Sequence, residues 1–461
     1  MKARFRFFAI AIVIVLLSVG CATAPRRAPE EAPPEEAAEQ ELEAYDSISL
    51  AVTAGDPQAA IAAYEEARLR DPDRPETMLL LANLMISAGR LDEAVAVLDD
   101  ILAEYPEYPD ALYQKALIAG ARGDNDRKER LLKDVIVTHE DFAPAHAALG
   151  ELYLEQESYD QAQAAFEQGL AADEGNFVAL IGLGNVYLRT DETAQAEDTL
   201  SRAIEAEPEY PFAYVDRSRA RIAEYDLEGA EEDLTRAIEL EPDYPWNYFD
   251  RGRVRVEIGR LEGAHEDFTS AIEMMPGMFM SYVERGRVND SMGNVAAAYA
   301  DYEQALELRP DYHPGYAPFG MYAFMQEDWD TAAEMFRKAY EREPRAHNYP
   351  LLSALAHKEA GREATAREYI ESELSSIPRD TLYYDMARYY LTPQGDGALL
   401  RQIEQSDDSV VKAQLLFNLG ALYELDGNTR LAQTMYVEVE DQGGPAVIEK
   451  RLAARKLESN E

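Results

Sequence analysis

Arginine and aspartate residues recur at a fixed spacing in the middle of the chain. Arg217, Arg251 and Arg285 are 34 residues apart, and an aspartate follows each arginine by 16 residues. Guanidinium and carboxylate groups form strong, charge-assisted hydrogen bonds when two structural elements bring them together. A local duplication would copy both residues at once, so the three cases are not independent. We predict three structural ion pairs: Arg217 with Asp233, Arg251 with Asp267, and Arg285 with Asp301.

The 34-residue spacing extends over most of the chain. Prolines recur at multiples of this period, at residues 72, 106, 208, 242, 276, 310, 344 and 378. A fixed period of this length is typical of a solenoid built from repeated helix pairs. Ten units, 41–74 through 347–380, share small residues at positions 8 and 20 and a large apolar residue at position 24, with few exceptions. Small residues let two helices approach closely, and the large residue fills the space between neighbouring units.

This pattern resembles the tetratricopeptide repeat, a pair of antiparallel helices. The resemblance covers residues 41–380 and again 413–446. It implies an all-α fold, a right-handed α-solenoid of stacked helical hairpins. We interpret residues 381–412 as an irregular helical hairpin. Residues 447–461 include an amphipathic, locally basic segment, which we expect to be a capping helix because the end of a repeat array needs a polar outer face.

The resemblance also implies a concave groove that binds peptides, lined by positions 2, 5, 9, 12 and 13 of the first helix of each unit. Four consecutive units place a polar residue at position 9, and aromatic residues stand beside them. Arginine and aromatic side chains often dominate the free energy of binding. The candidate peptide-binding residues are Asn185, Arg219, Arg253, Arg287, Phe212, Trp246 and Phe249.

The same arginines have an alternative role within their own helices. An acidic residue precedes each of them by three positions, at Asp216, Asp250 and Glu284. An exposed pair at this spacing stabilises a helix by only about 0.3 to 0.5 kcal/mol. The carboxylate clamp of the family also uses a lysine at position 5, which this chain lacks, so the resemblance does not imply recognition of a free C-terminus.

The N-terminus has the pattern of a bacterial secretion signal. Three basic residues precede an apolar run over residues 7–17, which is too short to span a bilayer. The only cysteine, Cys21, follows in a string that resembles the lipobox of bacterial lipoproteins, although Ser18 stands where that family usually has leucine. We therefore expect residues 1–20 to be a lipoprotein signal peptide and Cys21 to carry the lipid. Cleavage after Ala24, which would release a soluble protein, and an uncleaved anchor are the alternatives.

Residues 21–40 are rich in proline, alanine and glutamate and lack an apolar period. Such a segment buries too little surface to offset its ordering entropy, so we expect an extended tether between the lipid and the repeats. By the sorting rule known for enteric bacteria, the alanine after Cys21 points to the periplasmic face of the outer membrane.

Composition and motifs exclude several classes of function. The chain has 88 acidic and 44 basic residues, and its net charge of -44 repels nucleic acid and anionic lipid. We therefore expect contact with the membrane through the N-terminal lipid only. A single cysteine excludes intrachain disulfides and zinc sites with several cysteines. The six histidines are scattered, and no phosphate-binding, metalloprotease or serine-hydrolase motif is present. We expect no metal, no cofactor and no enzymatic activity.

These observations favour a non-enzymatic scaffold, lipid-anchored in the bacterial envelope, that binds peptide segments of partner proteins during assembly or localisation of envelope complexes. The chain then broadly resembles the repeat lipoproteins that act as assembly factors or pilotins. Two alternatives stay open. One is a regulator or accessory subunit of a cell-wall enzyme, and the other is a surface-exposed lipoprotein that binds external ligands.

Overall fold

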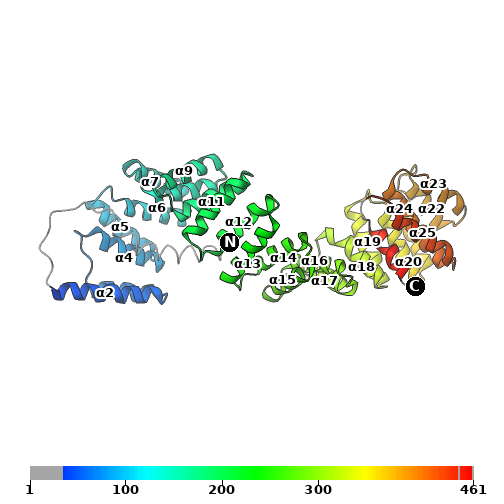
Figure 1. Ribbon diagram of the computed structural model, residues 1–461, viewed down its shortest axis with the longest axis horizontal. Coiled ribbons are helices and arrows are strands. Elements are labelled where there is room, and N and C mark those ends of the chain that lie inside the picture. The colour runs from blue at the N-terminus through cyan, green and yellow to red at the C-terminus, as the bar shows by residue number, and fades with distance from the viewer. Residues whose placement is uncertain (1–34, 445–446, 459–461) are drawn as a thin grey trace. The chain divides into compact units, whose positions relative to one another are not determined.

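The computed structural model describes residues 35–444 and 447–458, and all regular elements within these ranges are helices (Figure 1). The all-α fold class is thereby confirmed. The predicted signal peptide, Cys21 and the first part of the predicted tether lie outside the described residues. The chain divides into two compact units, with the division between Glu224 and Tyr225.

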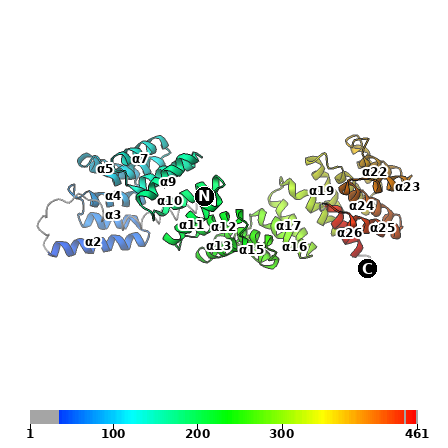
Figure 2. The same cartoon turned by 45° about the horizontal axis from the view of Figure 1, so that its top comes forward.

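Consecutive helices of the first unit pair as antiparallel hairpins with short connections (Figure 2). The helices are α2 (Glu35–Thr53), α3 (Pro57–Glu66), α4 (Pro75–Ser87), α5 (Leu91–Glu104), α6 (Pro109–Ala121), α7 (Asn125–Thr138), α8 (Ala143–Glu155), α9 (Tyr159–Ala172), α10 (Phe177–Arg189), α11 (Thr193–Ala206) and α12 (Pro211–Ala223).

The second unit continues with the same kind of hairpin and ends in a more compact group of helices. Its helices are α13 (Leu227–Leu240), α14 (Pro245–Glu257), α15 (Leu261–Met274), α16 (Phe279–Ser291), α17 (Val295–Leu308), the short 3-10 helix η1 (His313–Gly315), α18 (Tyr316–Met325), α19 (Trp329–Arg342), α20 (Asn348–Glu359), α21 (Glu363–Glu373), α22 (Leu382–Leu391), α23 (Asp396–Glu404), α24 (Ser409–Leu425), α25 (Thr429–Asp441) and α26 (Ile448–Glu458).

The repeated small and large residues form the seam of each hairpin. The alanine at position 20 is fully buried in most units, as Ala162 and Ala264 are. The ring of Phe166, at position 24, is also fully buried and packs where Gly150 leaves room. A Cβ atom at Gly150 would lie 2.6 Å from that ring. Absence of a side chain at position 8 therefore lets the aromatic residue enter the seam.

The turn inside each hairpin requires a left-handed residue at position 15. Gly89 and Gly123 adopt φ angles of 73° and 80° there, the conformation that ends many helices. Units without glycine keep the same geometry, because Glu157 and Asp191 adopt φ angles of 58° and 66°. The hairpin shape is thus determined by packing of the two helices and is retained where the local residue disfavours it.

The predicted tether is wrong over its last six residues, because α2 begins at Glu35. Alanine and glutamate are strong helix formers, which explains how a segment without an apolar period joins a helix. Packing anchors the rest of α2, in which Ile48 is buried and Glu41 accepts a hydrogen bond of 2.7 Å from Arg74. That hydrogen bond lowers the pKa of the Glu41 carboxyl.

The predicted irregular hairpin consists of α22 and α23, and it departs from the regular stack. Helix α24 packs directly on α20. Between these two helices lies Tyr390 of α22, whose hydroxyl donates to the Asn418 side chain at 2.8 Å and to the Leu351 carbonyl at 3.4 Å. Displacement of this hairpin brings helices that are distant in the sequence into one core, to which α26 also contributes.

Candidate peptide-binding groove

The arginines at position 7 belong to the hairpin seams of the second unit. Arg251 donates to the two carboxylate oxygens of Asp267 at 2.7 and 3.0 Å, and Arg285 donates to Asp301 at 2.6 and 3.1 Å. Each arginine also donates to a threonine of the preceding hairpin at 3.2 Å and lies over a tyrosine ring at 5.7 Å. These residues are structural and are not available to a ligand.

Arg217 has the same surroundings within the first unit. Its guanidinium group donates to Ser201 at 3.1 Å and lies 5.8 Å from the centre of the Tyr214 ring. Its predicted partner, Asp233, is buried and lies in the second unit. The Arg217–Asp233 pair stays a prediction.

A second set of arginines, at position 11, was missed from the sequence. Arg255 donates to Glu231 at 2.7 Å and to Asp267 at 2.9 Å, and Arg221 donates to Glu197 at 2.9 Å. The signal was present, because both the arginines and their glutamate partners are 34 residues apart. In the next unit Asn289 replaces the arginine and donates to Asp301 at 2.9 Å.

In the first unit, the predicted groove residues Asn185 and Arg219 converge on Asp216. The Asn185 amide donates to this carboxylate at 3.2 Å and Arg219 donates to it at 2.6 Å. Asp216 is 2% exposed and the Arg219 side chain 49% exposed. The alternative pairing within the helix is therefore present for Arg219, although half of its side chain still faces solvent.

In the second unit, the predicted groove residues Trp246 and Arg253 stand exposed on α14. They are seven residues apart and so share one face of the helix. Trp246 is 43% exposed. Arg253 is exposed and forms no hydrogen bond or ion pair with any residue that the structure describes, so it does not pair with Asp250. Val256, three residues further on, is 36% exposed and extends this apolar and cationic face.

Helix α16 adds Met280 and Arg287 at the equivalent positions. The Arg287 side chain is 58% exposed and reaches Glu284, the alternative partner, at 3.3 Å. A contact of this length at an exposed site contributes little. We call the surface formed by Trp246, Arg253, Val256, Met280 and Arg287 the open groove.

Tetratricopeptide repeat models match residues 51–119, 153–222, 281–312 and 319–380. The chain belongs to the tetratricopeptide repeat superfamily. No curated protein matches it significantly in sequence. Repeats of this superfamily are protein–protein interaction scaffolds, and the chain has the architecture of such a scaffold.

Several solved tetratricopeptide structures are similar to part of the chain. The tetratricopeptide protein YrrB, described as having an unusual peptide-binding site, has 21% identity and a TM-score of 0.37, over 40% of this chain and 95% of its own. PilF of Pseudomonas aeruginosa has 17% identity and a TM-score of 0.39, over 44% and 92% of the two chains. PilW, a type IV pilus biogenesis factor, has 19% identity and a TM-score of 0.40, over 44% and 94%. These similarities carry no inference about function.

The prediction that Phe249 and Phe212 line the surface of the groove is wrong, because both side chains are buried. Phe249 is 7% exposed, and its ring packs 5.8 Å from the ring of Phe268 in the hairpin seam. Phe212 is 2% exposed and packs 5.6 Å from Tyr210. An aromatic side chain gains more from entering the seam than from lining a solvated surface. Trp246 contacts Phe249 edge to face at 5.9 Å and keeps its outer face exposed.

The described residues show neither a metal site nor a membrane span. Within residues 35–444 and 447–458, no three His, Cys, Asp or Glu side chains are grouped so as to hold a metal ion. No helix in the same ranges combines the length and the apolar character that crossing a bilayer requires.

Proposed function

We propose that this scaffold binds acidic peptide segments of partner proteins in the open groove. The observation that carries the proposal is the exposed pair of Trp246 and Arg253 on one face of α14. A guanidinium group without a partner among the described residues is available to form charge-assisted hydrogen bonds with a ligand carboxylate. An exposed tryptophan beside it supplies apolar contact area, and residues of these two types are the commonest hot spots of interfaces.

The overall charge of the chain supports this assignment of ligand chemistry. With a net charge of -44, the protein repels acidic ligands at most of its surface. Arg253 and Arg287 are therefore exceptions to the surface composition. Arg253 lies on one face with the exposed side chains of Trp246 and Val256, and Met280, on the same helix as Arg287, is partly buried. An acidic segment with apolar or aromatic residues fits this combination.

We propose further that lipid on Cys21 anchors the scaffold at the periplasmic face of the outer membrane, where its partners are other envelope proteins. The support is the sequence of the N-terminus alone. A Cys21→Ala variant, expressed with the complete signal, tests the anchor. The wild-type chain should incorporate a labelled fatty acid and the variant should not, whether or not the variant stays in the membrane fraction through its uncleaved signal. Equal labelling of the two chains would contradict lipidation at this residue.

The groove is tested by crosslinking the full chain to its partners in intact cells. The Arg253→Glu/Arg287→Glu variant and the Trp246→Ala variant are each expected to lose the partners that the wild-type chain captures. Arg367→Glu is the matched control, because Arg367 is a 57% exposed arginine in an exposed helical pair on α21, away from position 9. Arg219 is left unchanged, because a glutamate there would face the buried carboxylate of Asp216 and destabilise the fold. Unchanged capture by both groove variants would show that the open groove is not the site.

A further inference from the structure

Helix α26 buries a stripe that is unusual for a terminal helix. Glu449, Leu452, Ala453 and Lys456 are spaced at i, i+3, i+4 and i+7, which places them on one face. Glu449, Leu452 and Ala453 are no more than 1% exposed, and the Lys456 side chain is 21% exposed. A helix that only closes an apolar core has no need of an acid at one end of this face and a lysine at the other.

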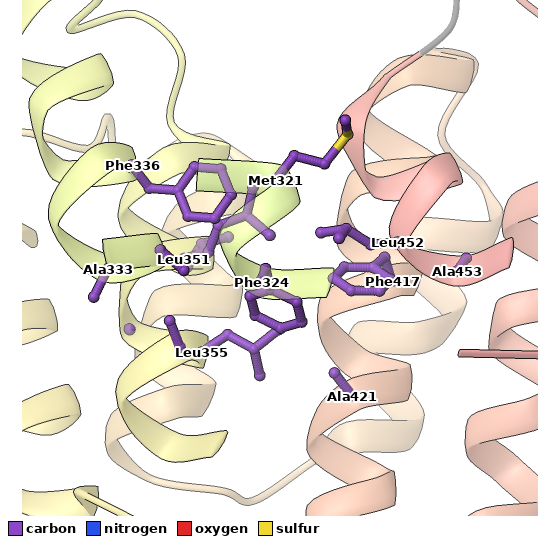
Figure 3. Close-up of a cluster of buried hydrophobic side chains, with 14 of the residues drawn as sticks. Met321, Phe324, Ala333, Phe336, Leu351, Leu355, Phe417, Ala421, Leu452 and Ala453 are labelled. Carbon is purple, nitrogen blue, oxygen red and sulfur yellow. The ribbon is translucent and has the colours of Figure 1, made fainter. Parts of the chain in front are cut away.

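The apolar middle of the stripe packs against the helices that precede α26. Leu452 and Ala453 belong to one buried cluster with Phe324 of α18 and Phe417 of α24. Figure 3 shows Leu452 beside Phe417, with Phe324 between α24 and α20. Helix α26 thus contacts α18, which precedes it by more than 100 residues in the chain, as well as α24 and α25.

Polar groups fix both ends of α26. Near its start, Asn348 donates to the Glu449 carboxylate at 2.9 Å. Near its end, Lys456 forms ion pairs with Glu359 at 2.8 Å and with Glu424 at 2.9 Å. Arg451 pairs with Asp290 of α16 at the edge of the contact. The surface that receives α26 is therefore acidic on the side of its basic residues.

The positions of these contacts identify the surface. Asn348 is at position 2 of the first helix of its unit, Asp290 and Glu424 are at position 12, and Glu359 is at position 13. These are the positions that line the concave groove of a tetratricopeptide unit. Helix α26 packs on α25 and α24, which leaves the expectation of a capping helix uncontradicted. Its stripe also covers groove residues, because the displaced α22–α23 hairpin brings α24 next to α20.

We propose that the groove of α18, α20 and α24 is a binding site for a basic amphipathic helix, that α26 is its resident occupant, and that a helix of a partner protein with the same pattern replaces α26. The partner helix carries a leucine and a small residue in succession, a lysine three residues after the small one, and an arginine just before the leucine. Its basic character separates it from the acidic ligand of the open groove.

One unsatisfied group makes α26 replaceable. The second carboxylate oxygen of Glu449 is buried and has no hydrogen-bond partner among the described residues. A buried polar atom without a partner weakens docking. A partner helix with an uncharged residue at this place avoids that penalty, and so can compete with a segment that benefits from being tethered to its own groove.

The test uses a fluorescent peptide of residues 447–458 and measures its binding by anisotropy. The full chain with Arg451→Glu/Lys456→Glu, in which α26 should be undocked, is expected to bind the peptide about a hundredfold more tightly than the wild-type chain, whose groove is filled by a tethered competitor. A peptide carrying the same two substitutions should not bind. Adding Glu359→Gln/Glu424→Gln to the opened chain should abolish binding, whereas adding Arg367→Glu, at a 57% exposed arginine of α21, should leave it unchanged.

Hydrogen exchange decides whether α26 is an occupant or part of the fold. In the opened chain, α26 amides should exchange rapidly while α18, α20 and α24 keep their protection. Loss of protection in α20 and α24 would overturn the proposal, as would absence of peptide binding to the opened chain. Leu452→Ala is a milder variant that removes only apolar contact. It should show the same pattern at smaller amplitude, and general unfolding of the unit by this variant would also overturn the proposal.

Discussion

The guanidinium group of Arg251 in α14 donates two hydrogen bonds to the carboxylate of Asp267 in α15, at 2.7 and 3.0 Å. The arginine side chain is 13% exposed and the aspartate side chain 3% exposed. Arg255 supplies a further hydrogen bond to the same carboxylate at 2.9 Å. Three charge-assisted hydrogen bonds offset the free-energy cost of removing the Asp267 carboxylate from water. The stability of the folded hairpin therefore depends on both arginines.

Arg251→Leu is expected to lower the free energy of unfolding by about 3 kcal/mol, the lower end of the usual range for removing one partner of a buried pair. The lower end applies because Arg255 remains bonded to Asp267. Chemical denaturation followed by circular dichroism measures the change. Arg367→Leu, in an exposed pair, is the control and should change the free energy by less than about 0.5 kcal/mol.

A double variant tests the cause of this loss. Arg251→Leu/Asp267→Leu removes the buried charge together with its partner, and should recover a large part of the lost stability. If the single variant is as stable as wild type while Asp267 is retained, the pair does not hold the two helices.

The sequence allowed the hairpins and these pairs to be predicted because both are local and repeated. A hairpin turn at position 15 places positions 7 and 23 opposite each other, and ten units allow a residue at one position to be compared with the residue at the other. The small residues at positions 8 and 20 are explained in the same way. No long-range information was needed, because each unit packs mainly on its neighbours.

The sites depend on contacts that no repeat pattern encodes. The aromatic residue Phe249 enters the seam while Trp246, on the same helix, stays exposed, because only Phe249 faces Phe268. The destination of α26 depends on the displacement of α22 and α23, where the repeat is interrupted. An amphipathic pattern shows that a helix has a face to bury, but not which surface will cover it.

The variant Gly150→Ala tests whether the hairpin seam requires a residue without a side chain at position 8. A Cβ atom there would lie 2.6 Å from the Phe166 ring, which is fully buried. Gly150→Ala should therefore lower the free energy of unfolding by about 1 to 3 kcal/mol through overpacking. The higher helix propensity of alanine offsets up to about 1 kcal/mol of this loss. Gly397→Ala, in α23, is the control because nothing lies within 4 Å of the new atom, and it should be neutral or stabilising. Equal effects of the two variants would show that the seam tolerates the extra carbon.

Substitution of Glu157 tests whether a left-handed residue with a side chain strains the hairpin turn. It holds a φ angle of 58°, which costs a residue with a side chain roughly 1 kcal/mol relative to glycine. Glu157→Gly should raise the melting temperature, although the greater freedom of glycine in the unfolded chain reduces the gain. The reverse change at the same position of another unit, Gly89→Ala, should lower the melting temperature, because Gly89 has a φ angle of 73° and open space around it. Changes of the same sign in both variants would exclude backbone strain as the cause.

Glu449 makes the docking of α26 depend on pH. Burial raises the pKa of this carboxyl to about 7 from its ordinary value of 4.5, and the groups that face it are the side chains of Asn348 and Gln414. Tyr349 and Tyr383 lie near enough to interact with its charge. Between pH 4.5 and 7 the docked carboxyl keeps its proton and the undocked one loses it, so docking weakens as the pH rises through this window.

Glu449→Gln should remove this dependence and, at pH 8, strengthen docking by about 3 kcal/mol relative to wild type, which is the free energy of the pKa difference. Hydrogen exchange of the α26 amides, corrected for the intrinsic effect of pH on exchange, measures the docking equilibrium from pH 4 to 8. The wild-type chain should show protection that falls with pH, and the variant should show protection that stays level. Glu458→Gln is the matched control, because this side chain lies at the exposed end of the same helix, and its profile should follow wild type. A wild-type profile that is flat between pH 4.5 and 7 would mean that the Glu449 carboxyl is ionised in the docked state and that its buried oxygen is solvated.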